Sequence, residues 1–297
     1  MFEMNNPDNS VDVKVWYTSN DEKSLLFVKD LGRYVQQADR TERGIDFEPK
    51  FVHWSCPQCD SDFTRKNCLS GGKYCAMSHD SNSEGQDETQ DGKDIVMENL
   101  RQLCVYKTAA DESTYRKFFM YLSHVHQLCG NRITDTCHQK SVLYMNQVVG
   151  IGGPVDNTKD FKKPDEFEKS VKKCVDDSFE TQPGMKPDPA VDDNRLLRKM
   201  LQEWTDYGHH IYPSVVINDV TFRGQMSPFN VFEAICAGFK DLPKHCSEWL
   251  QEKDLGTPHI DEIIKKKGIK RSRFIKIIVG LVSFNIVFVL IYKKRLN

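Results

Sequence analysis

The segment "IYPSVVINDVTFRG", Ile211 to Gly224, has the pattern of a β-hairpin whose first strand follows a proline. Its two apolar runs flank Asn218-Asp219, a residue pair that is typical of a tight turn between antiparallel strands. Ser227 and Pro228 follow, a helix N-cap residue and a first-turn proline, before apolar residues at helical spacing. This part of the chain therefore predicts two strands and a helix.

The beginning of the chain supplies a complementary pattern. The segment "VDVKVWYTSND", Val11 to Asp21, alternates apolar and polar residues, which indicates a strand that ends in a turn. Apolar residues then recur at helical spacing to about Gln37, and "FEPKFVHWS", Phe47 to Ser55, indicates a second strand. A strand, a helix and a strand in this order imply a right-handed crossover between parallel neighbours.

The middle of the chain is dominated by helical patterns. Four segments show helical apolar spacing: Ile95 to Tyr106, Tyr115 to Leu128, Val142 to Val149 and Leu196 to Trp204. A charged stretch with several prolines, Pro154 to Asn194, predicts one loose linker inside this insert, which covers about residues 95–205. The complete order is that of an α/β thioredoxin-like fold with a helical insertion, which we expect over residues 11–250.

In a thioredoxin-like fold the proline that opens the third strand is normally cis, and Tyr212-Pro213 occupies this place. We therefore predict a cis Tyr212–Pro213 bond; an ordinary trans proline at the start of a strand is the alternative. This loop is where such folds bind extended peptides, so His209, His210, Tyr212 and Pro213 form a candidate peptide-binding site. The two histidines would make binding respond to acidification between roughly pH 7 and 5. Polar loop residues without that role are the other interpretation.

The motif Cys56-Pro57-Gln58-Cys59 is typical of thiol oxidoreductases, but it follows the second predicted strand. A redox pair in this fold needs the amino end of the helix after the first strand, where helix-end amides lower the thiol pKa. That place, Thr18 to Leu26, contains no cysteine. Because twin glycines and further cysteines follow the motif, we expect a poor helix there, and we interpret the motif as a structural disulfide.

Two alternatives remain open for this motif. One is redox catalysis by Cys56 and Cys59. The other is a zinc site formed by these two residues together with Cys68 and Cys75, which have the ligand count of a structural zinc centre.

Ten cysteines, an even number, favour an oxidising compartment. All ten are structural disulfide candidates: Cys56, Cys59, Cys68, Cys75, Cys104, Cys129, Cys137, Cys174, Cys236 and Cys246. Cys129 with Cys137, and Cys236 with Cys246, are near enough in sequence to pair locally, and the first four are expected to pair among themselves. The sequence does not fix the connectivity.

The charge of the chain is balanced, with 41 basic and 43 acidic residues and a formal net charge of -2. Such a balance argues against a nucleic-acid partner. The sequence shows no glycine-rich phosphate loop and no hydrolase nucleophile motif. We therefore expect no cofactor, no metal site and no enzymatic activity.

The segment "FIKIIVGLVSFNIVFVLIY", Phe274 to Tyr292, is long and apolar enough to cross a bilayer as a helix. It predicts a single membrane anchor, preceded by a basic juxtamembrane linker over residues 251–273 and followed by a short tail, 293–297. A disordered start is expected for residues 1–10.

The orientation of this anchor is the subject of conflicting signals. Basic residues before the span and the absence of a signal-peptide pattern in Met1 to Asp12 favour a cytosolic, tail-anchored domain. The cysteine content favours a lumenal domain in a chain that lacks its true amino terminus. We favour the lumenal interpretation, and the tail-anchored one stays as an alternative.

Several blocks resemble the central lumenal region of the vacuolar sorting receptors of plant type. They are "WYTSNDE", Trp16 to Glu22, "FVKDLGR", Phe27 to Arg33, "KYCA", Lys73 to Ala76, "DGKDIVMENLRQLCVYK", Asp91 to Lys107, and "YPSVVINDVTFRG", Tyr212 to Gly224, followed by "AICAGF". The block Asp91 to Lys107 is the most specific. Family members usually have a cysteine pair near the end of the first strand, where this chain has Glu22-Lys23, which strengthens the non-catalytic interpretation.

The resemblance implies a single-pass membrane receptor of the endomembrane system, in the Golgi, an endosome or a vacuole. Such a receptor binds soluble protein cargo through peptide sorting signals and delivers it to a vacuole or a lysosome-like compartment. A membrane-tethered thiol-disulfide oxidoreductase that uses Cys56 and Cys59 is the alternative function.

Overall fold

A four-stranded mixed sheet forms the centre of the computed structural model, in the order β2-β1-β5-β6. Its strands are β1 (Val11–Tyr17), β2 (Ile45–Phe51), β5 (Ser214–Ile217) and β6 (Val220–Thr221). β1 is parallel to β2 and antiparallel to β5, which pairs in turn with β6 across the positive-φ turn Asn218-Asp219. The structure describes residues 10–38, 44–77, 91–111, 115–129, 133–148, 164–208 and 211–248.

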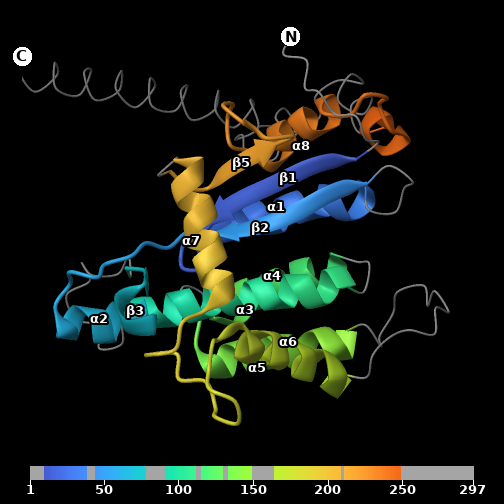
Figure 1. The fold of residues 1–297 in the computed structure, drawn as a ribbon. Coiled ribbons are helices and arrows are strands. Elements are labelled where there is room, and N and C mark those ends of the chain that lie inside the picture. Colours follow the sequence, from blue (N-terminus) through green and yellow to red (C-terminus); the bar gives the residue numbers. More distant parts are fainter. Residues whose placement is uncertain are drawn as a thin grey trace, which may run out of the picture. The chain divides into compact units, whose positions relative to one another are not determined.

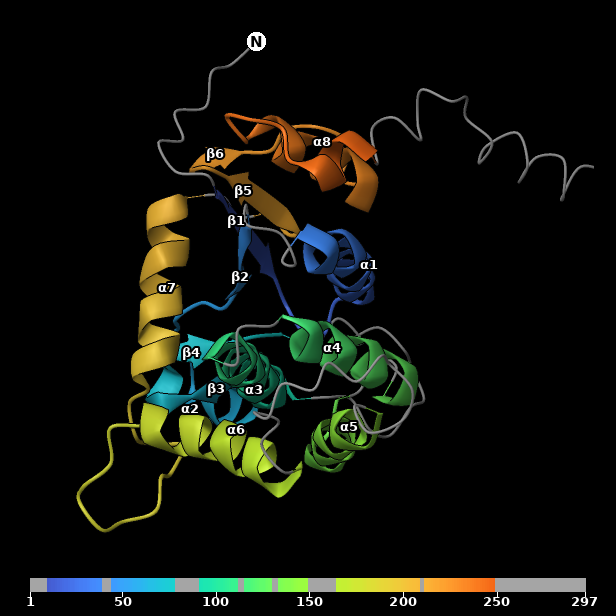
Figure 2. The same ribbon diagram turned by 90° about the vertical axis from the view of Figure 1, so that its right-hand side faces the viewer.

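Helices cover both faces of the sheet (Figure 2). On one face, α1 (Glu22–Ala38) packs against α8 (Pro228–Ala237), where Tyr34 stacks on Phe232 with ring centroids 4.8 Å apart. On the other face, α7 (Arg195–Tyr207) places Trp204 against Trp16 of β1, with ring centroids 5.1 Å apart. Because both faces are covered, β1 is buried along its length apart from two half-buried positions.

Four further helices extend the molecule beyond the sheet: α3 (Gly92–Asp111), α4 (Arg116–Cys129), α5 (Asp135–Val148) and α6 (Pro164–Ser178) (Figure 1). α3 and α4 lie next to the sheet, and Tyr17 of β1 donates a buried hydrogen bond to Gln102 of α3 at 2.9 Å. Phe47 of β2 contacts Phe119 of α4, with ring centroids 5.1 Å apart. The insert and the sheet therefore share one core.

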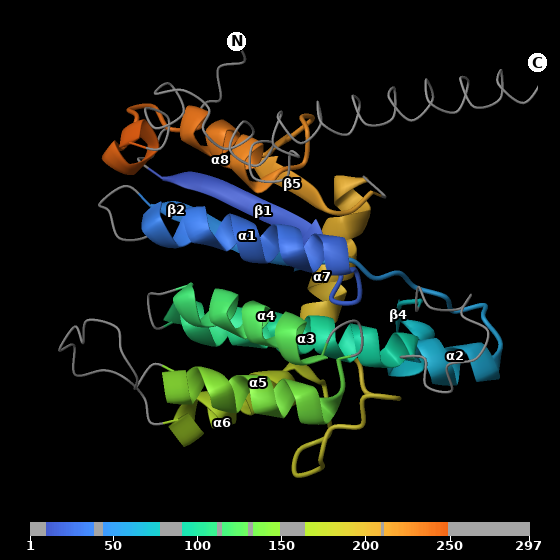
Figure 3. The ribbon, with the colours of Figure 1, turned by 180° about the vertical axis from the view of Figure 1, so that it is seen from behind.

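The segment after β2 is organised around two disulfides. It contains α2 (Ser61–Asn67), β3 (Cys68–Leu69), the short 3-10 helix η1 (Ser70–Gly72) and β4 (Tyr74–Cys75), which project from one end of α3 (Figure 3). The expectation of a poor helix here was wrong. The side chain of Asp60 caps α2 by accepting from the Phe63 amide at 2.8 Å, and the twin glycines lie after the helix, where both have positive φ.

Several local predictions are confirmed. The Tyr212–Pro213 bond is cis, the hairpin turns at Asn218-Asp219, and Ser227 caps α8 by accepting from the Asn230 amide at 3.2 Å. The predicted membrane span, residues 274–292, lies outside the described residues. Among the helices that the structure does describe, none combines the length and the apolar character that a bilayer crossing requires.

Candidate functional site

The candidate site lies at the amino end of α1, where a short loop connects β1 to the helix. The loop before α1 is anchored to α3: the Ser19 amide donates to the Asn99 side chain at 2.9 Å, and the Ser19 hydroxyl donates to the Ile95 carbonyl at 3.3 Å. Asn20 donates to the carbonyl of Met77 at 3.1 Å. The loop is therefore held by two other segments of the chain, which gives the helix start a fixed position.

An aspartate occupies the end of the helix itself. The carboxylate of Asp21 accepts from the Ser24 amide at 3.0 Å and from the Ser24 hydroxyl, in the manner of an N-cap. Glu22 and Lys23 follow it. The start of α1 therefore differs from a redox site, in which amides at the helix end stabilise a thiolate. Here the carboxylate of Asp21 accepts from the Ser24 amide, and none of the residues Asp21, Glu22 and Lys23 is a cysteine.

The cis-proline loop lies beside this helix end, as the fold predicts. The pKa of the Tyr212 phenol is raised by burial and, to a smaller extent, by the negative charge of Asp21, because the two residues are close enough to interact electrostatically. The hydroxyl of Ser214 donates to the carbonyl of Ile211 at 2.6 Å and fixes the entry to the loop. His209 and His210, the other two members of the predicted site, lie outside the described residues.

Exposed apolar side chains flank the same place. Ile211, two residues before the cis-proline, is 73% exposed, and Met77, whose carbonyl binds Asn20, is 57% exposed. Large apolar side chains with this exposure are suited to contact with another molecule. Among the described residues of this arrangement there is no cysteine with a free thiol.

All ten cysteines form disulfides. The two pairs expected from sequence proximity are present, Cys129–Cys137 and Cys236–Cys246, and the early cluster pairs within itself as Cys56–Cys59 and Cys68–Cys75. The Cys56–Cys59 pair is half-buried, and it precedes α2, which lies far from β5 in Figures 1 and 3.

The remaining disulfide, Cys104–Cys174, was not predicted. It joins α3 to α6 across a sequence separation of 70 residues. Cys104 has no exposed surface, whereas Cys174 is half-buried. The spacing of the two cysteines in the sequence does not indicate this pairing, because only the packing of α3 against α6 brings their sulfur atoms together.

A buried polar cluster inside the insert was also missed by sequence reasoning. Glu98 of α3 is fully buried and accepts from Gln102 at 3.0 Å and from the Tyr121 hydroxyl at 2.8 Å. Burial raises the pKa of the Glu98 carboxyl, and the Arg101 guanidinium opposes that shift. The Tyr121 hydroxyl is also 2.6 Å from Nδ1 of His138, so one hydroxyl connects the three helices α3, α4 and α5.

His53, which follows β2, is a second buried titratable group. Its Nε2 lies 2.8 Å from the carbonyl of Leu197 in α7, and its ring packs edge-on against Tyr74 of β4 at 5.5 Å. Because burial penalises the charged imidazolium, the pKa of His53 is lowered from 6.5 to about 4. The neutral side chain therefore connects α7 to the segment that contains the Cys56–Cys59 and Cys68–Cys75 disulfides.

This shift predicts that acidification destabilises the fold through His53. The unfolded chain takes up a proton as the pH falls below 6.5, whereas the folded chain does so only near pH 4, so His53 contributes stability that is lost with falling pH. Between pH 7 and 5 the loss amounts to about 2 kcal/mol. Urea unfolding of the full chain in detergent should show a loss between pH 7 and 5 that is about 2 kcal/mol larger in the wild type than in His53→Gln, which keeps a donor for Leu197. Burial also lowers the pKa of His138, so both proteins share that part of the pH dependence.

A control for this measurement is the interval from pH 7 to pH 8. Over that interval the wild type and His53→Gln should change in stability by nearly the same amount, because His53 is mostly neutral in both the folded and the unfolded chain. An identical pH dependence of the two proteins from pH 7 to 5 would contradict the prediction.

Comparisons with known proteins point to one family. The family model of the vacuolar sorting receptor thioredoxin-like domain matches residues 11–236. Similar proteins include vacuolar-sorting receptors 6 and 5 of Arabidopsis thaliana, 27% and 29% identical over 79% and 80% of this chain. Vacuolar-sorting receptor 1 of Pisum sativum is 27% identical over 79% of the chain. The matches cover 34% to 35% of these relatives, so the chain spans about a third of their length.

Proposed function

The chain belongs to the vacuolar sorting receptor family, and from this premise we propose that it binds soluble protein cargo for sorting to a vacuole or a lysosome-like compartment. The match of the family's thioredoxin-like domain over residues 11–236 carries the proposal. In this proposal the domain faces the lumen of the endomembrane system, and residues 274–292 anchor it in the membrane. Five disulfides support an oxidising environment for the domain.

The proposed action is binding without catalysis. The fold keeps the cis-proline loop beside the amino end of α1, but Asp21 and Glu22 stand where a redox fold would need a thiol. A fixed loop next to exposed apolar side chains suits an extended peptide, whose side chains alternate along the surface. We therefore place a peptide-binding site at Ile211, Tyr212 and Pro213, with His209 and His210 as its predicted neighbours.

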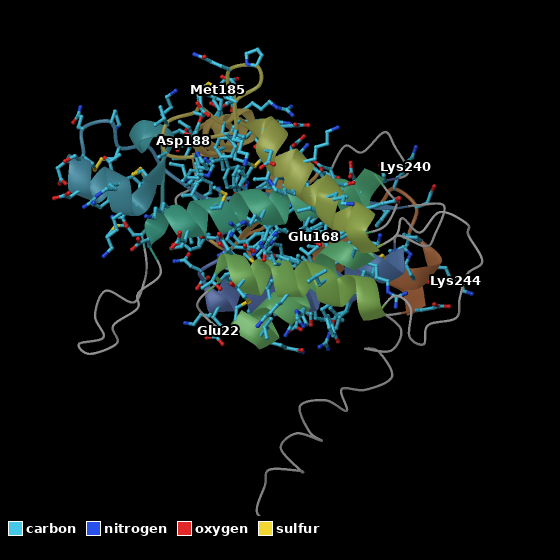
Figure 4. All side chains as sticks on the ribbon, turned by 90° about the horizontal axis from the view of Figure 1, so that it is seen from below. Glu22, Glu168, Met185, Asp188, Lys240 and Lys244 are labelled. Carbon is cyan, nitrogen blue, oxygen red and sulfur yellow. A yellow bond between two sulfur atoms is a disulfide. The ribbon has the colours of Figure 1, made fainter. Side chains whose placement is uncertain are left out.

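An affinity measurement with a matched control tests this site. Ile211→Asp introduces a charge at the entry to the cis-proline loop, while Val191→Asp makes the same type of change at a residue that is 71% exposed, close to the 73% of Ile211. Val191 precedes the amino end of α7, and Ile211 follows its carboxyl end. Figure 4 shows the loop before α7, labelled at Met185 and Asp188, on the side of the molecule away from Glu22.

The full chain in detergent would be applied to an array of overlapping peptides that cover soluble vacuolar proteins of its source organism. Affinities for the bound peptides would then be measured by fluorescence anisotropy. We expect Ile211→Asp to weaken binding by about tenfold or more and Val191→Asp to change it by less than about twofold. Equal affinities of both variants and the wild type would reject the site, and the absence of any bound peptide would reject cargo binding by this chain.

The alternative function rests on the half-buried Cys56–Cys59 disulfide, which immediately precedes the capped helix α2. An oxidoreductase of this kind would reduce insulin in the presence of a thiol donor, and the activity would disappear in Cys56→Ser. We expect the wild type and Cys56→Ser to show the same background rate. A rate that depends on Cys56 would favour the oxidoreductase over the receptor.

A further inference from the structure

A cavity of about 580 Å³ lies where the helical insert meets the edge of the sheet. Its walls come from the edge strand β2, the second half of α3, the part of α6 from Ser170 to Asp177 and the first residue of α7. The Cys104–Cys174 disulfide holds α3 to α6 at this point, and Cys174 itself lines the cavity. The volume lies in the range of about 300 to 1,000 Å³ that small ligands and peptide ends occupy.

The edge strand beside the cavity is closed to another strand. The Val52 amide donates to Tyr17 of β1, so alternate residues of β2, including Phe47 and Pro49, direct their backbone groups away from β1. Pro49 has no amide hydrogen, and the carbonyl of Phe47 accepts from the Tyr106 hydroxyl at 2.6 Å. A ligand of the cavity is therefore recognised by side chains and not by strand addition.

Three cationic side chains line the cavity, each from a different helix: Lys107 of α3, Lys173 of α6 and Arg195 of α7. Within the part of the chain that the structure describes, none of the three forms an ion pair with an acidic side chain. The Arg195 Nε donates to the main-chain oxygen of Asp177 at 3.4 Å, which orients the guanidinium. Its two terminal nitrogens then present a forked pair of donors to a ligand.

Two acidic residues share the lining, and they differ in their availability. Glu48 is bound by Lys50, whose Nζ lies 2.6 Å from its carboxylate and 2.7 Å from that of Glu203, so the two carboxylates share one cation. The side chain of Asp177 makes no ion pair with any described residue, so it can accept hydrogen bonds from a ligand. Three cations beside the two carboxylates Glu48 and Asp177 leave one excess positive charge in the lining. This excess matches a singly charged carboxylate, and Asp177 is open to N–H donors attached to it.

We propose that this cavity binds a carboxylate group of a peptide, held by the fork of Arg195 and supported by Lys107 and Lys173. The ring of Tyr106 forms the wall beside the ligand, and the carboxylate of Asp177 accepts a main-chain N–H of the peptide. The carboxylate is that of a chain terminus or of an acidic side chain, which share this chemistry. The inference goes beyond the sorting function and does not depend on it.

Three peptides that carry an uncharged BODIPY dye on the amino end, applied to the full chain in detergent, separate these sources: Ala-Leu-Val with a free carboxyl end, Ala-Leu-Val amide and Ala-Glu-Val amide. We expect at least one of the two carboxylate peptides to bind about tenfold more tightly than the neutral amide. A preference for the first assigns the site to a chain terminus, and a preference for the third assigns it to an acidic side chain. Equal anisotropy curves for all three would overturn the proposal.

Two variants of α7 localise the effect. Arg195→Gln should weaken binding of the preferred peptide by about tenfold, and Arg195→Lys should weaken it nearly as much, because the charge remains but the fork is lost. The control Lys199→Gln removes an exposed cation of the same helix, which pairs with Glu203 at 3.6 Å, and should change binding by less than about twofold.

Circular dichroism of each variant would show that α7 is intact, and Lys173→Gln gives a second loss variant on another helix. Unchanged affinity in both Arg195→Gln and Lys173→Gln would overturn the site. Displacement of the peptides by inorganic phosphate at a lower concentration than by acetate would overturn the carboxylate as its ligand.

Discussion

Replacing both Cys104 and Cys174 by alanine should lower the free energy of unfolding by about 4 kcal/mol. The disulfide closes a segment of 70 residues, and in the chain-entropy account a cross-link stabilises the fold by restricting the unfolded chain more strongly as that segment lengthens. The bond also holds α3 to α6, two helices that have extensive contact with each other but are far apart in sequence. Urea unfolding followed by tryptophan fluorescence would measure the loss.

The matched control is the double replacement of Cys56 and Cys59. These residues are three positions apart, so the same account gives a loss of only about 1.5 kcal/mol. Both double variants remove two half-cystines and leave no free thiol, so the difference between them reports the length of the closed segment. Equal losses would show that the strength of the Cys104–Cys174 link does not come from the restriction of the unfolded chain.

Replacing Trp204 by alanine should cost about 3 to 5 kcal/mol of unfolding free energy. Trp204 is 6% exposed and forms a small core with Trp16 and Val216 on one face of the sheet. Truncation leaves a cavity beneath α7, which cannot close because the helix is tied at its other end, where the Leu197 carbonyl binds His53 at 2.8 Å. Loss of this core should therefore loosen the carboxyl-terminal half of α7, while the end with Arg195 stays tied.

Trp54→Ala provides the comparison for this change. Trp54 is half-buried and contacts Phe63 of the disulfide segment, with ring centroids 5.8 Å apart. Its truncation removes a side chain of the same type with less burial, so a loss of about 1 to 2 kcal/mol is expected. A cost for Trp204→Ala as small as that for Trp54→Ala would contradict the assignment of the α7 face as a main part of the core.

The parts of the fold that sequence predicted are those whose signals are local. The alternation in β1, the Asn218-Asp219 turn and the Ser227 cap each depend on a few neighbouring residues, and each is present in the structure. The same reasoning failed at α2. The twin glycines and the cysteines predict a poor helix for the whole segment, but Gly71 and Gly72 follow the helix, and the cap by Asp60 stabilises its start.

The candidate sites were predictable to different extents. Pro213 could be placed beside the start of α1 because the order of strands and helices fixes that relation in the fold. The cavity near Arg195 could not be predicted, because its walls come from four elements separated by long stretches of sequence. The partner of Cys104 and the burial of Glu98 likewise depend on how helices pack, and residue type alone suggests the wrong environment for a glutamate.

The closed edge of β2 affects how the sheets of two copies of the domain can pair at high protein concentration. At the edge strand β2, Pro49 has no amide hydrogen to donate to a neighbouring strand, and the carbonyl of Phe47 already accepts from the Tyr106 hydroxyl. At the other end, β6 is two residues long. Both edges of this sheet therefore disfavour pairing with the sheet of a second copy, so the domain should resist edge-to-edge aggregation at high protein concentration.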